Sequence, residues 1–355
     1  MEQYEYYNFP KKYWRDHDIC WYLHDLMLSI FHECLDEESG NKLHVKIEEN
    51  GRRSLTELQD SDDTIEWLRE NGYLKEANLL LKKKSFHAIL ADFLGYIYES
   101  LETSMKGKTA ISYTLLRKPF KDNLFYLEWL LFDGDELINL IDENKLKEYE
   151  VGSLRKTNRK KMKDIIRNAY YVNEFRSSIL GSDIKWDFFY EVRYDYNKAN
   201  SLELIWNKAN HLVTTAPQIK SIDFNNIFLE EEDYINRWDY YYTKLPLLLL
   251  YSLGVVLKLY DKLIEKIPED TKQYNEIFIA TKWFSRINDQ TARNYIEEII
   301  SIIGNLPFNC NNCGNEVLIN DKRINALLND AGFNCDGCNE FIFFARYQFV
   351  EINSN

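Results

Sequence analysis

Two Cys-x-x-Cys pairs near the carboxyl end constrain this 355-residue chain more than any other feature. Cys310 and Cys313 form the first pair, Cys335 and Cys338 form the second, and 21 residues separate the two pairs. Each pair can present two sulfur atoms to one ion, and four thiolates in a tetrahedron are a common ligand set of structural Zn²⁺. The spacing is close to that of known four-cysteine zinc sites. The sequence therefore predicts one zinc ion bound by these four residues, with two unrelated thiol pairs as the alternative.

The residues around the cysteines predict a small β-module. Four protein ligands would leave no open position on the ion, so the zinc is expected to be structural. Gly314 and Gly337 suit the tight backbone turns of such pairs. The segments “LPFNCNNCGNEVLIN” and “FNCDGCNEFIFFARYQFVEI” read as short aromatic strands, and together with the cysteines they resemble a zinc ribbon.

That resemblance implies contacts with nucleic acid or with protein. Residues 306–355 carry three basic side chains and six acidic ones, which weakens the case for nucleic acid. We therefore expect the module to act as a folding clip or to contact a protein partner.

Composition predicts a helical protein of the cytoplasm. The chain has only 13 Gly and 6 Pro, which disfavours an all-β fold with many turns. Paired cysteines without an export signal in residues 1–20 favour metal binding in a reducing compartment over disulfides. The longest apolar run, residues 245–257, has about 13 residues, whereas a helix needs ~20 to cross a bilayer. We expect this run to be a buried helix, and we expect no membrane association.

Apolar periodicity predicts helices over most of the chain before the cysteines. No internal repeat is apparent. The predicted fold is mainly α. Residues 1–305 are predicted to form a large helical bundle, and residues 306–355 a four-cysteine zinc ribbon. An additional domain boundary inside the bundle, near 133–160, is an alternative. The predicted helices cover residues 11–36, 61–73, 74–105, 109–132, 160–178, 200–213, 231–265, 270–285 and 290–304.

The letters “KGKT” at residues 106–109 match the end of a phosphate-binding loop. Such a loop needs a glycine separated by four residues from its Gly-Lys pair, and this chain has Glu102 there. We therefore interpret Gly107 as a turn between two helices of a hairpin, with Thr109 as the N-cap of the second helix. Pro119 is predicted to kink or restart that second helix.

Two segments, “LLRKPFKDNLFYLEWLL” and “LELIWNKANHLVTTAP”, resemble the HEPN superfamily of bacterial helical domains over roughly residues 74–265. The resemblance implies a protein that acts through protein or nucleic-acid contacts, with a role in defence against phage. Nucleases of this superfamily carry an Arg, four to six further residues and then a His, usually with a polar residue after the Arg. His211 and Asn207 match the last two positions, but residues 204–206 hold Leu, Ile and Trp where the Arg is expected.

The resemblance also implies an alternative function, a metal-independent ribonuclease. In that case His211 would act as the acid and base, Asn207 would position the substrate, and Arg117 or Arg193 would supply the missing cation from another helix. His211 lies opposite the apolar face of its predicted helix, so it faces either solvent or a cleft or homodimer interface. A structural subunit of a multi-protein complex is a further alternative.

One basic segment stands out in a chain of net charge −13. Residues 145–168 hold nine Lys or Arg and three Asp or Glu, a local balance of +6. A solvated helix start is one interpretation, and contact with an RNA or DNA backbone is the other, with Tyr170 and Tyr171 placed to stack on bases. The residues predicted to contact nucleic acid are Arg155, Lys156, Arg159, Lys160, Lys161 and Lys163.

Two other groups are interpreted as structural. His17, Cys20 and His24 share one helical face and have metal-binding side chains, but large apolar residues share that face, so we predict core packing. Arg117 and Glu128 lie three helical turns apart, and we expect ion pairs with neighbouring helices.

Overall fold

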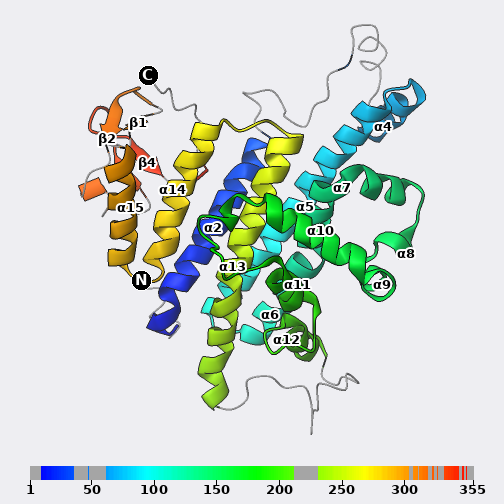
Figure 1. The fold of residues 1–355 in the computed structure, drawn as a ribbon, viewed down its shortest axis with the longest axis horizontal. Helices are drawn as coiled ribbons and strands as arrows, with labels where there is room; N and C mark the ends of the chain where they lie inside the picture. Colours follow the sequence, from blue (N-terminus) through cyan, green and yellow to red (C-terminus); the bar gives the residue numbers. More distant parts are fainter. Residues whose placement is uncertain are drawn as a thin grey trace.

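The computed structural model describes residues 9–35, 47, 61–211, 231–303, 307–310, 312–318, 322–323, 326, 332–343, 346–347 and 349. Over this part of the chain the fold is mainly α with a small β-containing module at its carboxyl end, as predicted (Figure 1). The module lies at the edge of the helical body, next to the last two helices.

The helical elements follow one another along the chain, and the described strands all come after the last helix. The helices are η1 (Lys11–Tyr13), α2 (Trp14–Glu33), α4 (Ser61–Glu70), α5 (Leu74–Met105), α6 (Thr109–Lys118), η2 (Pro119–Asn123), α7 (Leu124–Asp142), α8 (Leu146–Tyr149), α9 (Val151–Thr157), α10 (Arg159–Val172), η3 (Glu174–Arg176), α11 (Trp186–Tyr194), α12 (Leu202–Asn210), α13 (Glu231–Leu263), α14 (Glu269–Ser285) and α15 (Asp289–Ile303). Strands β1 (Pro307–Asn309) and β2 (Glu316–Leu318) form one antiparallel pair, and β3 (Gly332–Asn334) and β4 (Phe341–Phe343) form another.

Helices α5 and α6 form the predicted hairpin. Gly107 makes the turn with a φ of +74°, a left-handed conformation that glycine adopts without steric cost. The N-cap of α6 is Lys108 and not Thr109, which is the first helical residue and is buried, so that part of the prediction is wrong. Pro119 begins the π-helical segment η2 between α6 and α7, because proline has no N–H to donate to the preceding turn.

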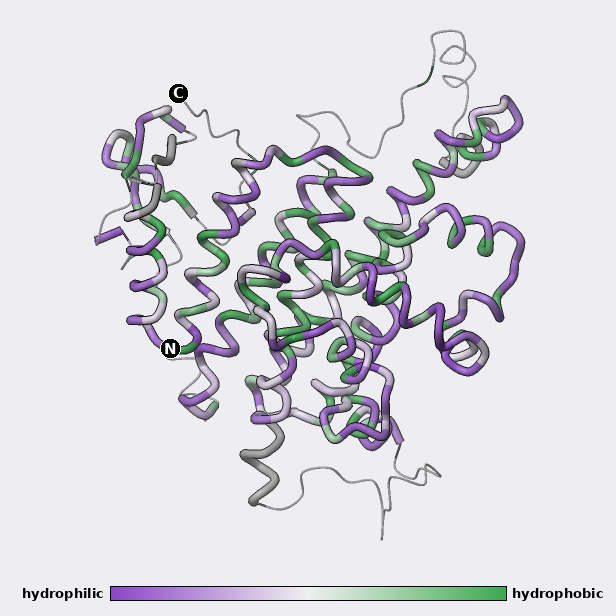
Figure 2. Tube along the Cα trace, in the orientation of Figure 1, coloured by the Kyte–Doolittle hydropathy of each residue, from purple (hydrophilic) through white to green (hydrophobic). Residues whose placement is uncertain are grey.

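Helix α13 runs through the middle of the fold and packs against α2, α5 and α7 (Figure 1). Its apolar run is buried, and Figure 2 shows hydrophobic residues concentrated along these central helices. Among the described helices, one segment (residues 238–263) is long and apolar enough to cross a membrane, but 83% of its apolar window is buried inside the protein. This segment is therefore a core helix, as predicted, and the cytoplasmic location stays a prediction.

Helix α10 ends at Val172, six residues before the predicted end at 178. Asn173 leaves the helix in an extended conformation, and its side chain accepts a hydrogen bond from the backbone N–H of Phe175. The same side chain donates to the carbonyl of Tyr251 on α13 at 2.9 Å. Gly254 permits this approach, because a Cβ atom there would lie 2.2 Å from Asn173 Oδ1. A tertiary contact to α13 therefore ends this helix.

The predicted packing role of His17, Cys20 and His24 is confirmed, since all three are buried on α2. Trp21 Nε1 donates to His17 Nε2 at 2.9 Å, so the ring proton lies on Nδ1, 2.8 Å from the hydroxyl of Tyr242. Burial lowers the pKa of His17 to about 3, which keeps the ring neutral. The polar atoms of His17, Trp21 and Tyr242 are therefore hydrogen-bonded to one another between α2 and α13.

The predicted ion pair of Glu128 with a neighbouring helix is also confirmed, and its partner is Arg193 on α11. Both side chains are fully buried, and Arg193 Nη2 and Nη1 donate to the two carboxylate oxygens at 2.7 and 3.0 Å. Tyr251 also donates to Glu128, at 2.6 Å. The guanidinium of Arg193 is thus buried in the core and held in an ion pair.

Two of the three hydrophobic clusters among the described residues bear on the predicted domain limits. The larger one includes residues on both sides of the predicted boundary near 133–160, a stretch that contains the end of α7 together with α8 and α9. The smaller one joins α14 and α15 to the β-module through Phe278, Ile296, Val317, Phe333 and Ile342. The domain limits at 1–305 and 306–355 stay predictions.

Candidate metal centre and basic surface

The two Cys-x-x-Cys pairs lie at the tips of two antiparallel hairpins. Cys310 and Cys313 fall between β1 and β2, and Cys335 and Cys338 fall between β3 and β4. The turns close in the same way: Cys310 N donates to the carbonyl of residue 315 at 2.9 Å, and Cys335 N donates to that of residue 340 at 2.8 Å. Each strand pair therefore presents two thiols from one end.

The hairpins are copies of a short repeat that sequence analysis missed. “FNCNNCGNEV” and “FNCDGCNEFI” share Phe-Asn-Cys-x-x-Cys, and the strand register pairs Phe308 with Val317 and Phe333 with Ile342. The shared hexapeptide was a visible signal, but two copies of six letters are too short to stand out in a search for repeats.

The two glycines of the turns have different roles. Gly314 adopts a φ of +72°, as predicted, whereas in the second turn Asn339 takes the left-handed position with a φ of +59°. Gly337 lies against the other hairpin, because a Cβ atom there would lie 1.8 Å from Nδ2 of Asn315 and the Asn315 side chain would have to move. The predicted turn role therefore belongs to Asn339 and not to Gly337, which packs against the other hairpin.

The four sulfur atoms fit one tetrahedral ion. They all lie within 4.8 Å of one another, with 3.6 Å between Cys310 and Cys338 and 3.7 Å between Cys313 and Cys335. Bonds of ~2.3 Å from a central zinc would place sulfurs about 3.8 Å apart in a tetrahedron. The observed contacts are far longer than the ~2.05 Å of a disulfide. The predicted grouping of the four cysteines is confirmed, and the identity of the ion stays a prediction.

The local backbone favours the thiolate form of Cys335, whereas the neighbouring thiols raise the pKa of Cys313. N–H groups of Cys338 and Gly337 lower the pKa of Cys335 to about 7, and Gly337 N lies 3.3 Å from its sulfur. Cys310 and Cys335 are buried, while Cys313 is exposed.

Helix α10 presents a row of cations on its outer face. Lys160, Lys163, Arg167 and Tyr171 are spaced by three or four residues, so they share one face of the helix. We call these four residues the basic stripe; at 1.5 Å per residue it spans about 17 Å. The opposite face is buried in the core through Met162, Ile165, Ile166, Ala169 and Tyr170.

Two of the six residues predicted to contact nucleic acid are used inside the protein. Arg155 pairs with the buried Glu203 at 2.8 Å, and Lys161 pairs with Glu136 at 2.7 Å. The other four make no ion pair with a carboxylate among the described residues; they are Lys156, Arg159, Lys160 and Lys163.

A pocket of about 430 Å³ opens at the carboxyl end of the basic stripe. Tyr171 is 53% exposed there, the guanidinium of Arg176 lies 5.4 Å from its ring centre, and Tyr170 is buried with its hydroxyl donating to a backbone carbonyl. The stacking position predicted for Tyr171 is thus accessible, and that of Tyr170 is not. The lining has two cations, three aromatic rings and no carboxylate: Tyr170, Tyr171, Arg176, Ser177, Gly181, Ser182, Lys185 and Trp186.

The residues predicted for ribonuclease chemistry lie on or beside two packed helices. Thr114 of α6 donates to the carbonyl of Ala209 on α12 at 3.4 Å. Arg117 is exposed on α6, Asn207 is half-buried on α12, and His211 is exposed one residue past the end of α12. Among the described residues, no hydrogen bond or ion pair joins these three side chains. Their catalytic role stays a prediction.

The ribonuclease alternative has a direct test. It predicts that the purified protein cleaves total RNA or tRNA, and that His211→Ala slows cleavage by about 10²-fold, the effect of losing a general acid and base. Lys208→Ala, an exposed change on the same helix, should leave cleavage unchanged. Equal cleavage by wild type and His211→Ala, or no cleavage by either, would contradict this alternative.

Comparisons of the chain with protein-family models, with curated proteins and with solved structures find no match. The HEPN resemblance and the possible homodimer therefore stay predictions.

Proposed function

We propose that this protein binds single-stranded nucleic acid through the basic stripe and the pocket at its end. The observation that carries the proposal is the row of cations on α10 that leads to the exposed ring of Tyr171. Lys160 and Lys163 make no ion pair with a carboxylate among the described residues, whereas Arg167 pairs with Asp164 of the same helix at 2.6 Å. A ligand with regularly spaced phosphates and flat bases is complementary to such a surface.

Each part of the surface contributes a distinct interaction. Lysines without carboxylate partners can neutralise phosphates and release counterions, which makes binding salt-dependent. An exposed tyrosine gives a stacking platform worth ~1–3 kcal/mol per base, and Arg176 beside Tyr171 adds a cation at the same place. The net charge of −13 repels nucleic acid from the rest of the protein and confines binding to this surface.

The proposed ion of the metal centre is Zn²⁺. Thiolates and tetrahedral geometry suit zinc, and a set of four protein ligands leaves no position for a substrate. Its role would be to join the two hairpins, which pack on α14 and α15. The module would then be a folding clip. A bacterial, cytoplasmic role in anti-phage defence is part of the proposal on the strength of the HEPN resemblance alone.

Removing two cations of the basic stripe tests the proposal. We expect Lys160→Gln/Lys163→Gln to weaken binding of labelled oligo(U) and oligo(dT) in fluorescence anisotropy. Each lost phosphate contact should reduce the slope of log K against log salt by about 0.7, so the double variant should be about 1.4 shallower.

Lys75→Gln/Lys266→Gln is the matched control, because both lysines are exposed and the change in net charge is the same. Its affinity and salt slope should equal those of the wild type. If both double variants lose affinity equally, or neither does, the basic stripe is not the binding surface.

A further inference from the structure

The pocket at the end of the basic stripe is held in shape by the segment that joins α10 to α11. The amide of Leu180 donates to the carbonyl of Phe175 at 2.9 Å, and Gly181 then turns the chain with a φ of +72°. The hydroxyl of Tyr170 donates to the carbonyl of Ile184 at 2.5 Å, which fastens the returning segment to the end of α10. The pocket therefore has a defined wall on each side.

The polar groups of this pocket are available to a ligand. Arg176 and Lys185 line it, and neither makes an ion pair with a carboxylate among the described residues. Ser177 is exposed, and its hydroxyl makes no hydrogen bond within the described part of the chain. The hydroxyl of Ser182 donates to Asp183 at 3.4 Å. Two cations and one hydroxyl can thus donate to the same bound group.

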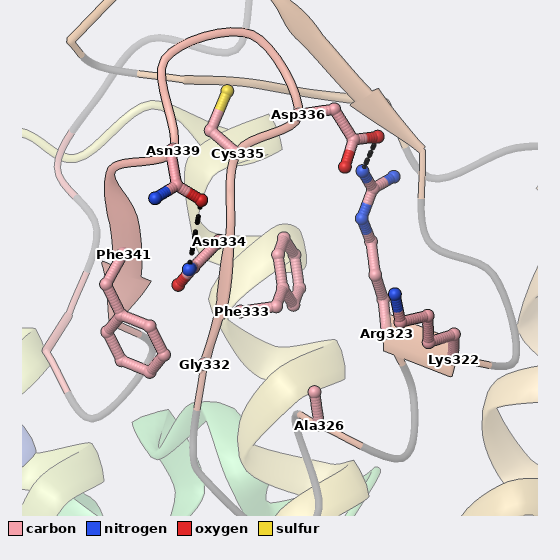
Figure 3. A pocket seen from close by; sticks show the side chains of 10 residues that line it. All are labelled: Lys322, Arg323, Ala326, Gly332, Phe333, Asn334, Cys335, Asp336, Asn339 and Phe341. Carbon is pink, nitrogen blue, oxygen red and sulfur yellow. Dashed lines mark hydrogen bonds and ion pairs between the residues drawn. The ribbon is translucent and has the colours of Figure 1, made fainter.

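A second pocket, of about 780 Å³ beside β3, shows the contrasting case. Its lining includes Asp336, and Figure 3 shows this carboxylate paired with Arg323 of the same pocket. The lining of the pocket beside Tyr171 has no carboxylate to compensate its cations. The negative charge that is complementary to those cations must therefore come from a ligand.

The amount of charge distinguishes a terminal phosphate from an internal one. Along the basic stripe, Lys160 and Lys163 are three residues apart, about 4.5 Å along the helix axis, so single charges follow one another as in a chain of phosphodiesters. The pocket instead gathers Arg176 and Lys185 around one space of about 430 Å³. A phosphate monoester carries a charge of about −1.5 to −2 at pH 7 and has three acceptor oxygens. Two cations match such a group better than they match a single phosphodiester charge.

Carboxylates next to the pocket favour a strand that ends there. Asp183 follows the lining residue Ser182, and Asp187 follows the lining residue Trp186. Both aspartates are exposed, and neither makes an ion pair with a cation among the described residues. A strand that continued past this wall would bring its next phosphate toward like charges. A strand whose last phosphate lies in the pocket avoids that repulsion.

We infer that this pocket binds the terminal nucleotide of a strand that carries a phosphate monoester at that end. The phosphate lies between Arg176 and Lys185, and the base stacks on Tyr171. The volume of about 430 Å³ lies within the range of ~300–1,000 Å³ of small-molecule pockets. This inference rests on the proposed function, because it assigns the end of the strand that the basic stripe binds.

Competition by unlabelled octauridylates against labelled oligo(U) tests this inference on the full chain. The three competitors carry a 5′-phosphate, a 3′-phosphate or hydroxyls at both ends. A phosphate at one of the two ends should lower Kd about tenfold relative to the hydroxyl form, since it adds hydrogen bonds to charged groups. The preferred end gives the direction of the strand along α10.

Two pocket variants and two comparisons locate the preference. Lys185→Gln and Arg176→Gln should each remove most of the preference for the phosphorylated end. Lys322→Gln, which removes an exposed lysine from the pocket beside β3, should keep it. Lys160→Gln/Lys163→Gln should weaken all three competitors by the same factor, so the ratio of their Kd values should stay unchanged.

The outcomes separate this inference from the function on which it rests. If no octauridylate binds, the proposed function fails, and the inference fails with it. Equal Kd values for the three competitors, or a preference that survives in both pocket variants, would overturn the inference alone. Competition by 5′-UMP or 3′-UMP as strong as that of the phosphorylated octamer would also overturn it, because a free nucleotide would then be the ligand.

Discussion

Removal of the proposed zinc ion is expected to unfold the C-terminal module while leaving the central helices folded. Structural zinc contributes about 10–16 kcal/mol of apparent binding free energy in small zinc domains, which is far more than two strand pairs of three residues can supply. Loss of the ion should also loosen α14 and α15, because Tyr274, Phe278 and Ile296 share a hydrophobic cluster with the module. The core around α13 has its own contacts and should persist.

Hydrogen exchange of Cys335→Ser, or of the chelated wild type, measures this effect. Amides of strands β1 to β4 and of α15 should lose protection, and those of α13 should keep it. Cys34→Ser is a matched control, because Cys34 is buried in the helical core, outside the four-cysteine cluster, and should not affect metal content. Unchanged protection in metal-free protein would show that the module folds without an ion.

The second large effect is expected from Arg193→Ala, which should destabilise the protein by about 3–5 kcal/mol. The change leaves the carboxylate of Glu128 fully buried, with the hydroxyl of Tyr251 as its one remaining hydrogen-bond partner among the described residues. An uncompensated buried charge costs more than the ion pair contributes. Urea unfolding followed by circular dichroism measures the loss.

A double variant separates charge from packing at this site. Arg193→Met/Glu128→Leu removes both charges with side chains of similar size, so it should recover much of the lost stability. Arg117→Ala on the exposed face of α6 should change stability by less than about 0.5 kcal/mol. If the double variant were as unstable as Arg193→Ala, the buried charge would not be the cause.

The long helices could be predicted from sequence because their apolar faces repeat over many turns. Helices α13, α14 and α15 agree with the predicted 231–265, 270–285 and 290–304 to within two residues at each end. Helix α11 was missed: it has nine residues, many of them aromatic, and short helices depend on tertiary contacts. In α11 that contact is the ion pair of Arg193 with Glu128, 65 residues away.

The candidate sites were also predicted only where the signal is local in the sequence. The four cysteines could be predicted because the ligands of such a metal site are of one residue type and lie close together in the sequence. The sequence could not show which cations of the basic segment lack a carboxylate partner. The partners of Arg155 and Lys161 are Glu203 and Glu136, which lie on other helices. The pocket beside Tyr171 was also missed, although basic and aromatic residues alternate over 167–186 and could have pointed to it.

Ultraviolet crosslinking of the protein to oligo(U) that contains 4-thiouridine, followed by mass spectrometry of the peptides, tests the central claim most directly. We predict crosslinks on Tyr171 or Trp186 and on neighbouring residues of α10, and their loss in Lys160→Gln/Lys163→Gln. Crosslinks confined to other parts of the chain, such as residues 332–343 of the metal-binding module, would contradict the assignment of the basic stripe as the nucleic-acid surface.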